Sequence, residues 1–356
     1  MMESQVEVLS EEYISEPTAT VSKIYSDVLE HKPRKYWDYQ NFNPQYDDIE
    51  KYSLTCKLSS GRYSEVFEAI DDSTDEKCVV KVLKPIITNR VKREIRMLEE
   101  LNGEFNVIKL KAVVLTPPQT ALIFEHVNSV GFDKMFLTLS EFEVRYYTYE
   151  LLKALNYCHS KGIMHRDVKP HNIIVNRTEK KLHLIDWGLA EFYHRGHEYN
   201  VRVASRYFKS PELLLDYEYY DYSLDMWSLG CLFASLIFRR YPFFKGKNNM
   251  DHLERIVTVL GSNDLVAYTQ KYNIALPERF QLKMCNKALW GQFVNEENEY
   301  LVNDDALNLL EQLLRYDHTT RITALEALEH RYFKPVLLHQ KDRQSASGSR
   351  GENGRL

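Results

Sequence analysis

The sequence predicts an α+β fold in which a small β-rich lobe precedes a larger α-helical lobe. Between residues 52 and 127, short apolar runs are separated by turn signals such as D-D-S-T-D-E and T-P-P-Q, a pattern typical of strands. From Glu141 onward, apolar residues recur at the three-and-four spacing of helices. The length of 356 residues is ample for a sizeable core. We expect the joint between the two lobes near residues 125–130.

The first lobe is expected to contain strands and one helix. The strands are predicted at residues 52–58, 65–70, 78–83, 112–115 and 121–125. Residues 90–100 break this pattern, because Val91, Ile95 and Leu98 have helical spacing. The helical lobe opens with a helix predicted over residues 141–160. We assign residues 36–127 to the first lobe, with its N-terminal segment, and residues 128–335 to the second.

Both ends of the chain are expected to lie outside the folded part. Residues 1–35 are polar and acid-rich, which predicts a flexible segment. The aromatic run Tyr36-Trp37-Asp38-Tyr39 that follows needs a surface on which to pack. Residues 336–356 are predicted to form a disordered tail, because the stretch from Gln340 is rich in Ser, Gly and Arg and cannot bury a core.

The composition indicates a soluble protein of a reducing compartment. There are 46 Lys and Arg against 51 Asp and Glu, a formal net charge of −5, which does not favour general binding to nucleic acid or to anionic membranes. The longest apolar runs fall well short of the roughly 20 residues that span a bilayer. Five widely spaced cysteines argue against a disulfide framework or a zinc site. We therefore expect a cytoplasmic or nuclear location.

The strongest motif is a polar loop followed by a second acidic motif. The run His165-Arg166-Asp167-Val168-Lys169-Pro170-His171-Asn172 comes just after the predicted helix, and Asp186-Trp187-Gly188 follows an apolar stretch 14 residues later. A carboxylate, a cation and hard oxygen ligands are what phosphoryl transfer with Mg²⁺ requires. Asp167 would orient and deprotonate an acceptor hydroxyl, and Lys169 would neutralise the transferring phosphoryl group. Asn172 and Asp186 would hold the metal.

A second constellation lies in the predicted β-rich lobe. Lys81 stands between apolar strand neighbours, and Glu94 follows 13 positions later on the predicted helix, where an ion pair could hold Lys81 against nucleotide phosphates. The segment 58–66, L-S-S-G-R-Y-S-E-V, occupies the place of a glycine-rich phosphate loop G-x-G-x-x-G-x-V, but only Gly61 is kept. Ser59 and Ser64 stand where glycine would allow close approach of the backbone to phosphate, and the sequence leaves their effect open.

On these motifs, residues of about 36–335 resemble a eukaryotic protein kinase, with the bilobal fold of that family. Within the family the chain is similar to the catalytic alpha subunits of casein kinase II. The motifs that carry this closer resemblance are R-K-Y-W-D-Y at 34–39, Y-S-E-V-F-E-A-I at 63–70, F-E-H-V at 124–127, M-H-R-D-V-K-P-H-N at 164–172, L-I-D-W-G-L-A-E-F-Y-H at 184–194 and E-Y-N-V-R-V-A-S-R-Y-F-K at 198–209.

The resemblance implies transfer of the γ-phosphoryl group of ATP, or of GTP, with Mg²⁺ to Ser or Thr that acidic residues follow. The hinge residues Glu125, His126 and Val127 would have to accommodate either nucleobase. The nucleotide-binding set that the resemblance implies is Leu58, Ser59, Gly61, Val66, Val79, Lys81, Glu94, Phe124, Glu125, Val127, His171, Ile174 and Ile185.

A cationic cluster independently favours acidic protein substrates. Arg202, Arg206 and Lys209 lie just before Pro211, where a substrate would lie, and cations there select carboxylates by complementary charge. The alternatives are solvated charges or an arm for a phosphorylated loop. The resemblance further implies activity without loop phosphorylation, with residues 36–39 packed on the loop. It also implies that Glu212 of Ser210-Pro211-Glu212 pairs with Arg321.

The resemblance also implies a partner and shows one departure. The family forms a heterotetramer in which a dimer of regulatory beta subunits docks on the outer face of the sheet, where Leu54, Phe67, Val80 and Ile123 are apolar. The lysine run of the family is thinned here to K-P-I-I-T-N-R-V-K-R at 84–93, so we expect weaker demand for distal acidic residues and weaker inhibition by heparin.

Two other functions compete with an acid-directed kinase. A proline-directed kinase shares the long insertion at about residues 246–300, but the cationic cluster opposes it. A non-catalytic scaffold with the same fold would have lost one of the catalytic residues, and none is lost. The damaged glycine loop is the only support for the scaffold.

Overall fold

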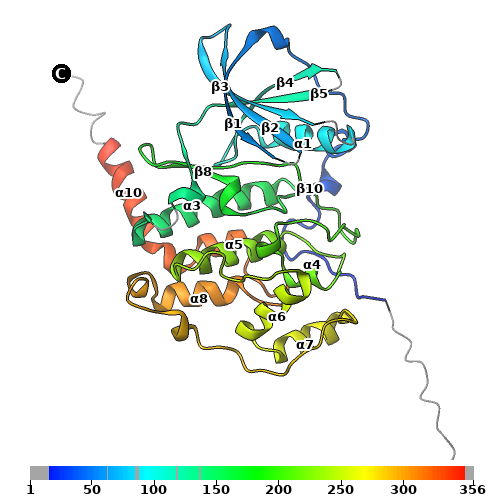
Figure 1. The fold of residues 1–356 in the computed structure, drawn as a ribbon, viewed down its shortest axis with the longest axis vertical. Coiled ribbons are helices and arrows are strands. Elements are labelled where there is room, and N and C mark those ends of the chain that lie inside the picture. The colour runs from blue at the N-terminus through cyan, green and yellow to red at the C-terminus, as the bar shows by residue number, and fades with distance from the viewer. Residues whose placement is uncertain (1–15, 62, 85–87, 118, 136–137, 349–356) are drawn as a thin grey trace, which may run out of the picture.

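The computed structural model describes residues 16–348 except 62, 85–87, 118 and 136–137. It places a β-sheet and one long helix above a larger body of helices (Figure 1). The sheet has five antiparallel strands in the order β1-β2-β3-β5-β4. Their bounds are β1 Tyr52–Ser60, β2 Ser64–Asp71, β3 Glu76–Leu83, β4 Leu110–Thr116 and β5 Gln119–Glu125. The helix is α1, Thr88–Leu101. The predicted α+β fold with two lobes is confirmed, and each of the five predicted strands is present.

The helical body carries three very short strand pairings that the sequence did not predict. These strands are β6 Val130–Gly131, β7 Ile163–Met164, β8 Ile173–Asn176, β9 Lys181–Leu184 and β10 Glu191–Phe192. The pairs β6–β8, β8–β9 and β7–β10 are all antiparallel. They frame the loop at residues 165–172 and the motif at 186–188. Their function in the fold is therefore to hold these two loops side by side.

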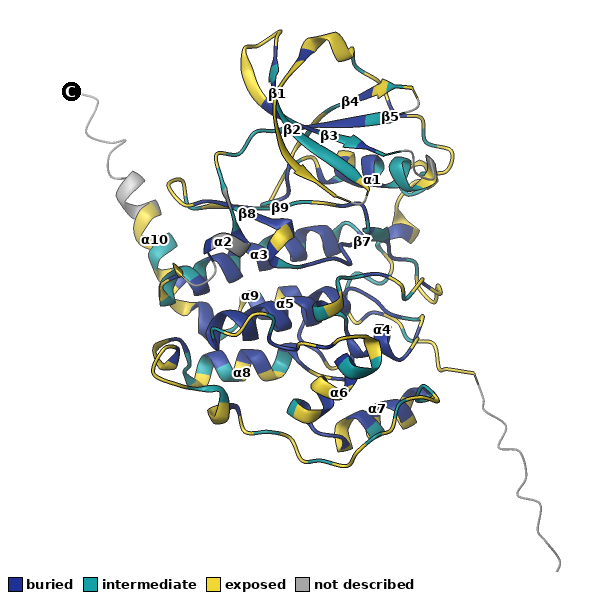
Figure 2. Ribbon diagram, in the orientation of Figure 1, coloured by how far each residue is buried: buried dark blue, intermediate teal, exposed yellow. Residues whose placement is uncertain are grey.

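The helices of the second lobe surround one buried helix. The helices are α2 Phe132–Met135, α3 Glu141–Ser160, α4 Pro211–Leu214, α5 Ser223–Ile237, α6 Asn249–Leu260, α7 Asn263–Tyr272, α8 Asp304–Leu313, α9 Ala324–Leu328 and α10 Lys334–Gly348. Helix α5 is buried at every position from Leu224 to Ile237, and it lies between α3 and α8 (Figure 2). A helix that is mostly apolar and buried on every side belongs in the centre of a core.

Helix α3 has the bounds that the sequence predicted. A capping box begins it, because the Ser140 side chain accepts from the Glu143 amide while Glu143 accepts from the Ser140 amide. Gly162 follows the helix with φ +76°, a backbone conformation that favours glycine. The predicted helix at 90–100 also forms, and it runs three residues longer overall as α1.

The predictions for both ends of the chain require correction. The structure contradicts flexibility for residues 16–35, because Leu29 is buried against Gly162 and the backbone of Thr18 bonds Tyr272. Residues 1–15 lie outside the described part. The tail is not disordered up to residue 348, since it forms α10. Val336 is fully buried there, and Gln340 donates to Glu150, so a few anchoring contacts suffice for a polar helix.

Among the described residues, no helix is both long enough and apolar enough to cross a membrane. The five cysteines are all free: three are buried, Cys285 is half-buried and Cys56 is exposed. Cys56 faces solvent on β1.

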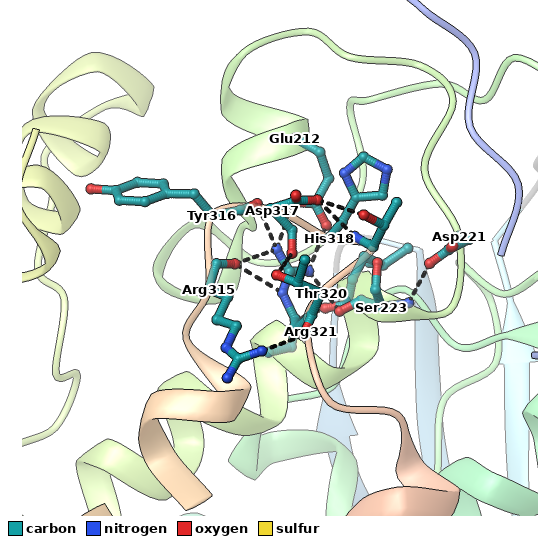
Figure 3. Close-up of polar contacts among 12 residues, drawn as sticks. Glu212, Asp221, Ser223, Arg315, Tyr316, Asp317, His318, Thr320 and Arg321 are labelled. Carbon is teal, nitrogen blue, oxygen red and sulfur yellow. Dashed lines mark hydrogen bonds and ion pairs between the residues drawn. The ribbon is translucent and has the colours of Figure 1, made fainter. Parts of the chain in front are cut away.

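A buried ion pair joins the segment before α5 to the loop after α8 (Figure 3). Both terminal nitrogens of the Arg321 guanidinium group donate to Glu212, at 2.8 and 3.0 Å, and neither side chain is exposed. Arg321 also donates to the backbone oxygens of Ser223 and Arg315. Burial opposes the charge of Glu212, but Arg321 outweighs it and lowers the pKa of the carboxyl group. This pairing was predicted from the sequence.

Glu212→Gln should destabilise the fold strongly. The substitution keeps the size of the side chain but leaves the charge of Arg321 buried without a counter-charge, which typically costs about 3–5 kcal/mol. Urea unfolding followed by circular dichroism measures the loss. Glu329→Gln, on an exposed glutamate, is the matched control and should change stability little. A loss below about 1 kcal/mol for Glu212→Gln would contradict a stabilising role for the pair.

Candidate active site

The loop at residues 165–172 is fixed from below by one carboxylate. The backbone amides of His165 and Arg166 both donate to Asp225 of α5, each at 2.8 Å, and the His159 ring contacts the same carboxylate at 3.0 Å. Asp225 is fully buried. Arg166 has φ +64°, a left-handed conformation that is unfavourable for a non-glycine residue and is held here by these bonds.

The three side chains that the sequence placed in this loop lie together. The Lys169 ammonium group bonds Asp167 Oδ2 at 2.6 Å, and Asn172 Nδ2 donates to the same oxygen at 3.0 Å. Asn172 Nδ2 also donates to the backbone oxygen of Asp167 at 2.8 Å. Since both bonds come from its nitrogen, the amide oxygen of Asn172 is left to accept a cation.

Ser205 is a member of the site that the sequence did not identify. Its amide and its hydroxyl both donate to Asp167 Oδ1, at 3.0 and 2.9 Å, and its hydroxyl accepts from Lys169 at 2.9 Å. The preceding Ala204 has φ +59°, which turns the chain toward the loop. A lone serine carries no spacing signal, because 38 residues separate it from Asp167.

Lys81 lies on the side of the site that the β-sheet forms. Its ammonium group lies 2.7 Å from Glu94 Oε1 on α1 and 2.8 Å from Asp186 Oδ1, and its side chain is 13% exposed. Burial acts to lower the pKa of Lys81, but the two carboxylates outweigh burial and raise that pKa. The predicted Lys81–Glu94 pair is present. Lys81 is therefore a fixed positive charge that faces the loops of the helical lobe.

Asp186 and Asn172 are suited to hold a divalent cation. The amide of Ile185 donates to the backbone oxygen of Asn172 at 2.9 Å, so the two candidate ligands lie on adjacent loops. Burial opposes the charge of Asp186, but Lys81 outweighs it and lowers the pKa to about 2. The side chain is 46% exposed and charged at neutral pH. A carboxylate and an amide oxygen are the donor set that Mg²⁺ prefers.

A cavity of about 290 Å³ lies between these groups. Six of the predicted residues line it: Gly61, Lys81, Glu94, Asp167, Lys169 and Asp186. Tyr63, Arg90 and Ser205 also line it. The cavity therefore collects the charged residues from both lobes at one place, with a volume that suits the phosphate end of a nucleotide and an acceptor side chain.

The remaining predicted nucleotide contacts lie outside the lining of this cavity. Val79 pairs with Phe124 across β3 and β5, and Val66 pairs with Lys81 across β2 and β3. Three half-buried side chains pack against the main core, namely Val127, Ile174 and Ile185. Three other side chains are exposed, namely Leu58, Ser59 and His171. The apolar members of this set belong to the sheet, to the segment after β5 and to the β8–β9 hairpin, including the residue that follows it. A flat ring could insert between the face formed by the sheet and the face formed by the hairpin.

Glu125 is turned away from such a ring. Its Oε1 accepts from the backbone amide of Lys109 at 2.9 Å, and its own amide donates to the backbone oxygen of Lys109 at 3.1 Å. His183 lies 3.8 Å from the same carboxylate. The Glu125 side chain therefore fastens the end of β5, and contact with a nucleobase is left to the backbone.

The β1–β2 turn does not require its glycine. The Gly61 amide donates to Ser64 O at 2.8 Å, and Lys84 Nζ donates to Gly61 O at 2.9 Å. A Cβ atom at Gly61 would meet only Ser64 O, at the ordinary distance of 3.7 Å. The turn is thus a hydrogen-bonded hairpin end, and the serines that replace the other glycines are accommodated.

The three cations at 202–209 differ in their surroundings. Arg202 and Arg206 are exposed, as a substrate contact requires. Lys209 is half-buried, and its ammonium group donates to the backbone oxygens of Val203 and Val201. Burial lowers the pKa of Lys209. Lys209 therefore holds the backbone of its own loop, and the two arginines are the cations directed to solvent.

Comparison with protein families finds a match. The model described as the protein kinase domain matches residues 52–333, which is well over half of the 356 residues. The matched stretch begins at β1 and ends just before α10. It includes both loops, the Lys81–Glu94 pair and the segment that contains Ser205.

Asp186→Asn should abolish most phosphoryl transfer while the fold persists. The variant removes the charged ligand for Mg²⁺ and one of the two carboxylates that face Lys81, so we expect a loss of about 10²-fold or more in kcat. Transfer of labelled phosphate from ATP measures it. Asp342→Asn, on an exposed aspartate of α10, is the matched control. A rate for Asp186→Asn above a tenth of the normal rate would exclude the assigned metal role.

Proposed function

The chain belongs to the protein kinase family, and on that premise we propose that it phosphorylates Ser or Thr followed by acidic residues. Protein kinases transfer a phosphoryl group to proteins and generally use ATP and Mg²⁺. The finer proposal is a kinase of the casein kinase II type that needs no loop phosphorylation. The scaffold alternative loses support, because the catalytic side chains of both lobes line one cavity.

The observation that carries the proposal is the bond between Asp167 and Ser205. It ties the segment 202–209 directly to the carboxylate that would receive the acceptor hydroxyl. Arg206 immediately follows Ser205, and Arg202 lies three residues before it, both exposed. A peptide whose hydroxyl reaches Asp167 thus passes beside two guanidinium groups. Arginine binds carboxylates in a bidentate manner, which favours acidic residues near the acceptor.

In the proposed reaction Asp167 orients the acceptor hydroxyl and takes its proton. Lys169, 2.6 Å from Asp167, neutralises charge on the phosphoryl group as it moves to the acceptor oxygen. Lys81 holds the nucleotide phosphates, and Glu94 keeps Lys81 in position. Asn172 and Asp186 would hold Mg²⁺, which, when bound, neutralises charge on the β- and γ-phosphates.

Contacts of Arg166 support activity without loop phosphorylation. Its Nε donates to Leu189 O at 2.7 Å, and its Nη1 donates to the Tyr220 hydroxyl at 3.0 Å. Its Nη2 lies 3.4 Å from Glu191, which also pairs with Arg93 of α1. Oxygen atoms of the chain itself therefore bind the Arg166 guanidinium group, which could otherwise bind a phosphorylated residue.

The aromatic segment before the kinase domain packs on the same loop. The Tyr36 ring lies 5.8 Å from that of Phe192, and Trp37 meets His194 edge-on at 4.9 Å between centroids. Arg96 of α1 donates to the backbone oxygen of Tyr36 at 3.0 Å. The predicted packing of this segment is present. It joins α1 to the loop and supports a permanently ordered arrangement.

The proposal extends to the choice of nucleotide and to a partner. Use of GTP beside ATP depends on the backbone near Glu125 and Val127, because the Glu125 carboxylate is engaged with Lys109. For a regulatory beta subunit dimer, Val80 and Ile123 are unsuitable contacts, since they are 1% and 0% exposed. Leu54, which is 53% exposed, and the half-buried Phe67 are left to receive a partner.

The thinned basic run supports a weaker demand for distal acidic residues. Of its described cations, Lys84 bonds Gly61 O, Arg90 bonds Gly188 O and Arg93 pairs with Glu191. Lys92 is directed to the backbone oxygen of Gln40. Residues 85–87 lie outside the described part. Since these cations already have partners within the chain, we propose weak binding of heparin and other polyanions.

Two peptides separate acid-directed from proline-directed specificity. One carries Ser followed by Asp and Glu, and the other carries Ser followed by Pro. We expect at least tenfold higher kcat/KM for the acidic peptide, with ATP·Mg²⁺ and with GTP·Mg²⁺, because a pair of guanidinium groups discriminates by complementary charge. Arg202→Gln/Arg206→Gln should reduce this preference and leave the rate on the other peptide unchanged.

The control for this assay is Asp186→Asn. Equal rates on both peptides, or faster turnover of the Ser-Pro peptide, would refute acidic selectivity. If turnover of both peptides is no better than with Asp186→Asn, kinase activity is refuted and the scaffold is favoured.

Removal of residues 1–40 should cut turnover by about tenfold or more, because the loop at 192–194 loses the aromatic rings that hold it. Since Leu29 is also lost, thermal unfolding must be measured in parallel. Trp37→Ala tests the bracing contact alone and should lower kcat about 3- to 10-fold. Tyr46→Ala, on an aromatic that is 49% exposed, is the control. Full activity of both altered proteins would contradict the bracing.

A further inference from the structure

Arg90, on α1, is a cavity-lining cation to which the mechanism assigns no function. Its Nε donates to the backbone oxygen of Gly188 at 3.0 Å. Its guanidinium carbon lies 4.6 Å from the centroid of the Tyr63 ring, within the range of a cation–π contact. Tyr63 directly precedes β2, and Gly188 belongs to the motif that contains Asp186. One side chain therefore contacts both walls of the phosphate end of the cavity.

Two other contacts of the described residues of the β1–β2 turn hold it to its own lobe. Lys84 Nζ donates to Gly61 O at 2.9 Å, and the Lys84 amide donates to Tyr63 O at 3.0 Å. Both bonds join the turn to the end of β3. The contact through Arg90 differs, because it reaches the loop of the helical lobe that carries the proposed metal ligand.

The loop at Gly188 has little freedom to move independently of Asp186 and Glu94. A Cβ atom built on Gly188 would lie 3.2 Å from Glu94 Oε2 and 3.4 Å from Asp186 Oδ1. Asp186 itself has φ +61°. The residue whose backbone oxygen Arg90 binds is thus two positions from Asp186, and it packs closely beside Glu94, the partner of Lys81. A shift of Arg90 would therefore disturb the positions of Asp186, the proposed metal ligand, and of Lys81, the phosphate-binding lysine.

We propose that Arg90 is a positioning residue that clamps Tyr63, beside the phosphate-covering turn, to the metal-binding loop at Gly188. The inference rests on the proposed kinase function. It accounts for a phosphate turn in which serines replace two glycines. A turn that Arg90 already holds in place does not lose conformational freedom when the nucleotide binds. This saving in entropy offsets the backbone–phosphate contacts that glycines at the two serine positions would allow.

The clamp predicts a coupled loss in Arg90→Met and Tyr63→Leu. Each single variant should lower kcat/KM for ATP about 5- to 20-fold, because each removes the link between turn and loop. The double variant should be no worse than Arg90→Met alone, since a broken link cannot be broken twice. KM for the peptide should not change. Tyr63→Phe keeps the ring and should retain more activity than Tyr63→Leu.

Arg255→Met is the matched control, because Arg255 is an exposed arginine that pairs with Asp251 on α6, away from the cavity. Additive losses in the double variant would overturn the clamp. A rise in KM for the peptide alone would also overturn it, and would make Arg90 a contact for acidic substrates. If the unaltered protein transfers no phosphate, the kinase proposal fails, and the affinity for ATP·Mg²⁺ by calorimetry tests the clamp. Non-additive weakening would support it, and equal affinities would overturn it.

Discussion

Two backbone amides of the catalytic loop, those of His165 and Arg166, donate to the same buried carboxylate, that of Asp225. An isolated carboxylate in the interior is costly, so it stays charged only where donors surround it. Here burial opposes the charge, and the His159 contact and the loop amides outweigh it and lower the pKa of Asp225. The loop cannot move without leaving this charge unpaired. This constraint fixes the positions of the three loop residues Asp167, Lys169 and Asn172.

Helix α5 extends the constraint to the other side of the site. Its first residue, Ser223, accepts from Arg321, which is held by Glu212 (Figure 3). Asp225 is two residues further along, and Ser228 donates to Phe208 O at 2.9 Å in the segment that carries Ser205 and Arg206. The buried helix thus fixes the catalytic loop and the proposed substrate segment together. Their relative placement is a property of the core.

Local patterns in the sequence were sufficient to predict the longer strands and helix α3. Turn signals in the sequence flank the strands, and α3 has a capping box at one end and a glycine after the other. The pairs β7–β10 and β6–β8 involve two residues on each strand, too few to show a period. Helix α10 is polar along much of its length, and its anchors, such as Val336, are single contacts with distant elements. Composition alone could not reveal them.

The site was predictable where a motif carries it and obscure where the fold creates it. Asp167, Lys169, Asn172 and Asp186 follow from spacing within two short loops, and their proximity is now seen directly. Ser205 bonds a residue 38 positions away, and Arg90 bonds one 98 positions away. Such pairs depend on how segments far apart in the sequence pack together, which no local pattern encodes. For the same reason the engagement of Glu125 with Lys109 was not anticipated.

Asp167 is already saturated with donors in this arrangement. Its Oδ1 accepts from the amide and the hydroxyl of Ser205, and its Oδ2 accepts from Lys169 and Asn172. A carboxylate offers about four acceptor positions, so an acceptor hydroxyl can bind only by replacing one of these donors. The two amide nitrogens are fixed by the backbone and by the bond to Asp167 O. The exchangeable donors are the Ser205 hydroxyl, which can rotate, and the Lys169 ammonium group, which a phosphoryl group attracts. Binding of both substrates therefore frees the base that the reaction needs, and the carboxylate stays paired until they arrive.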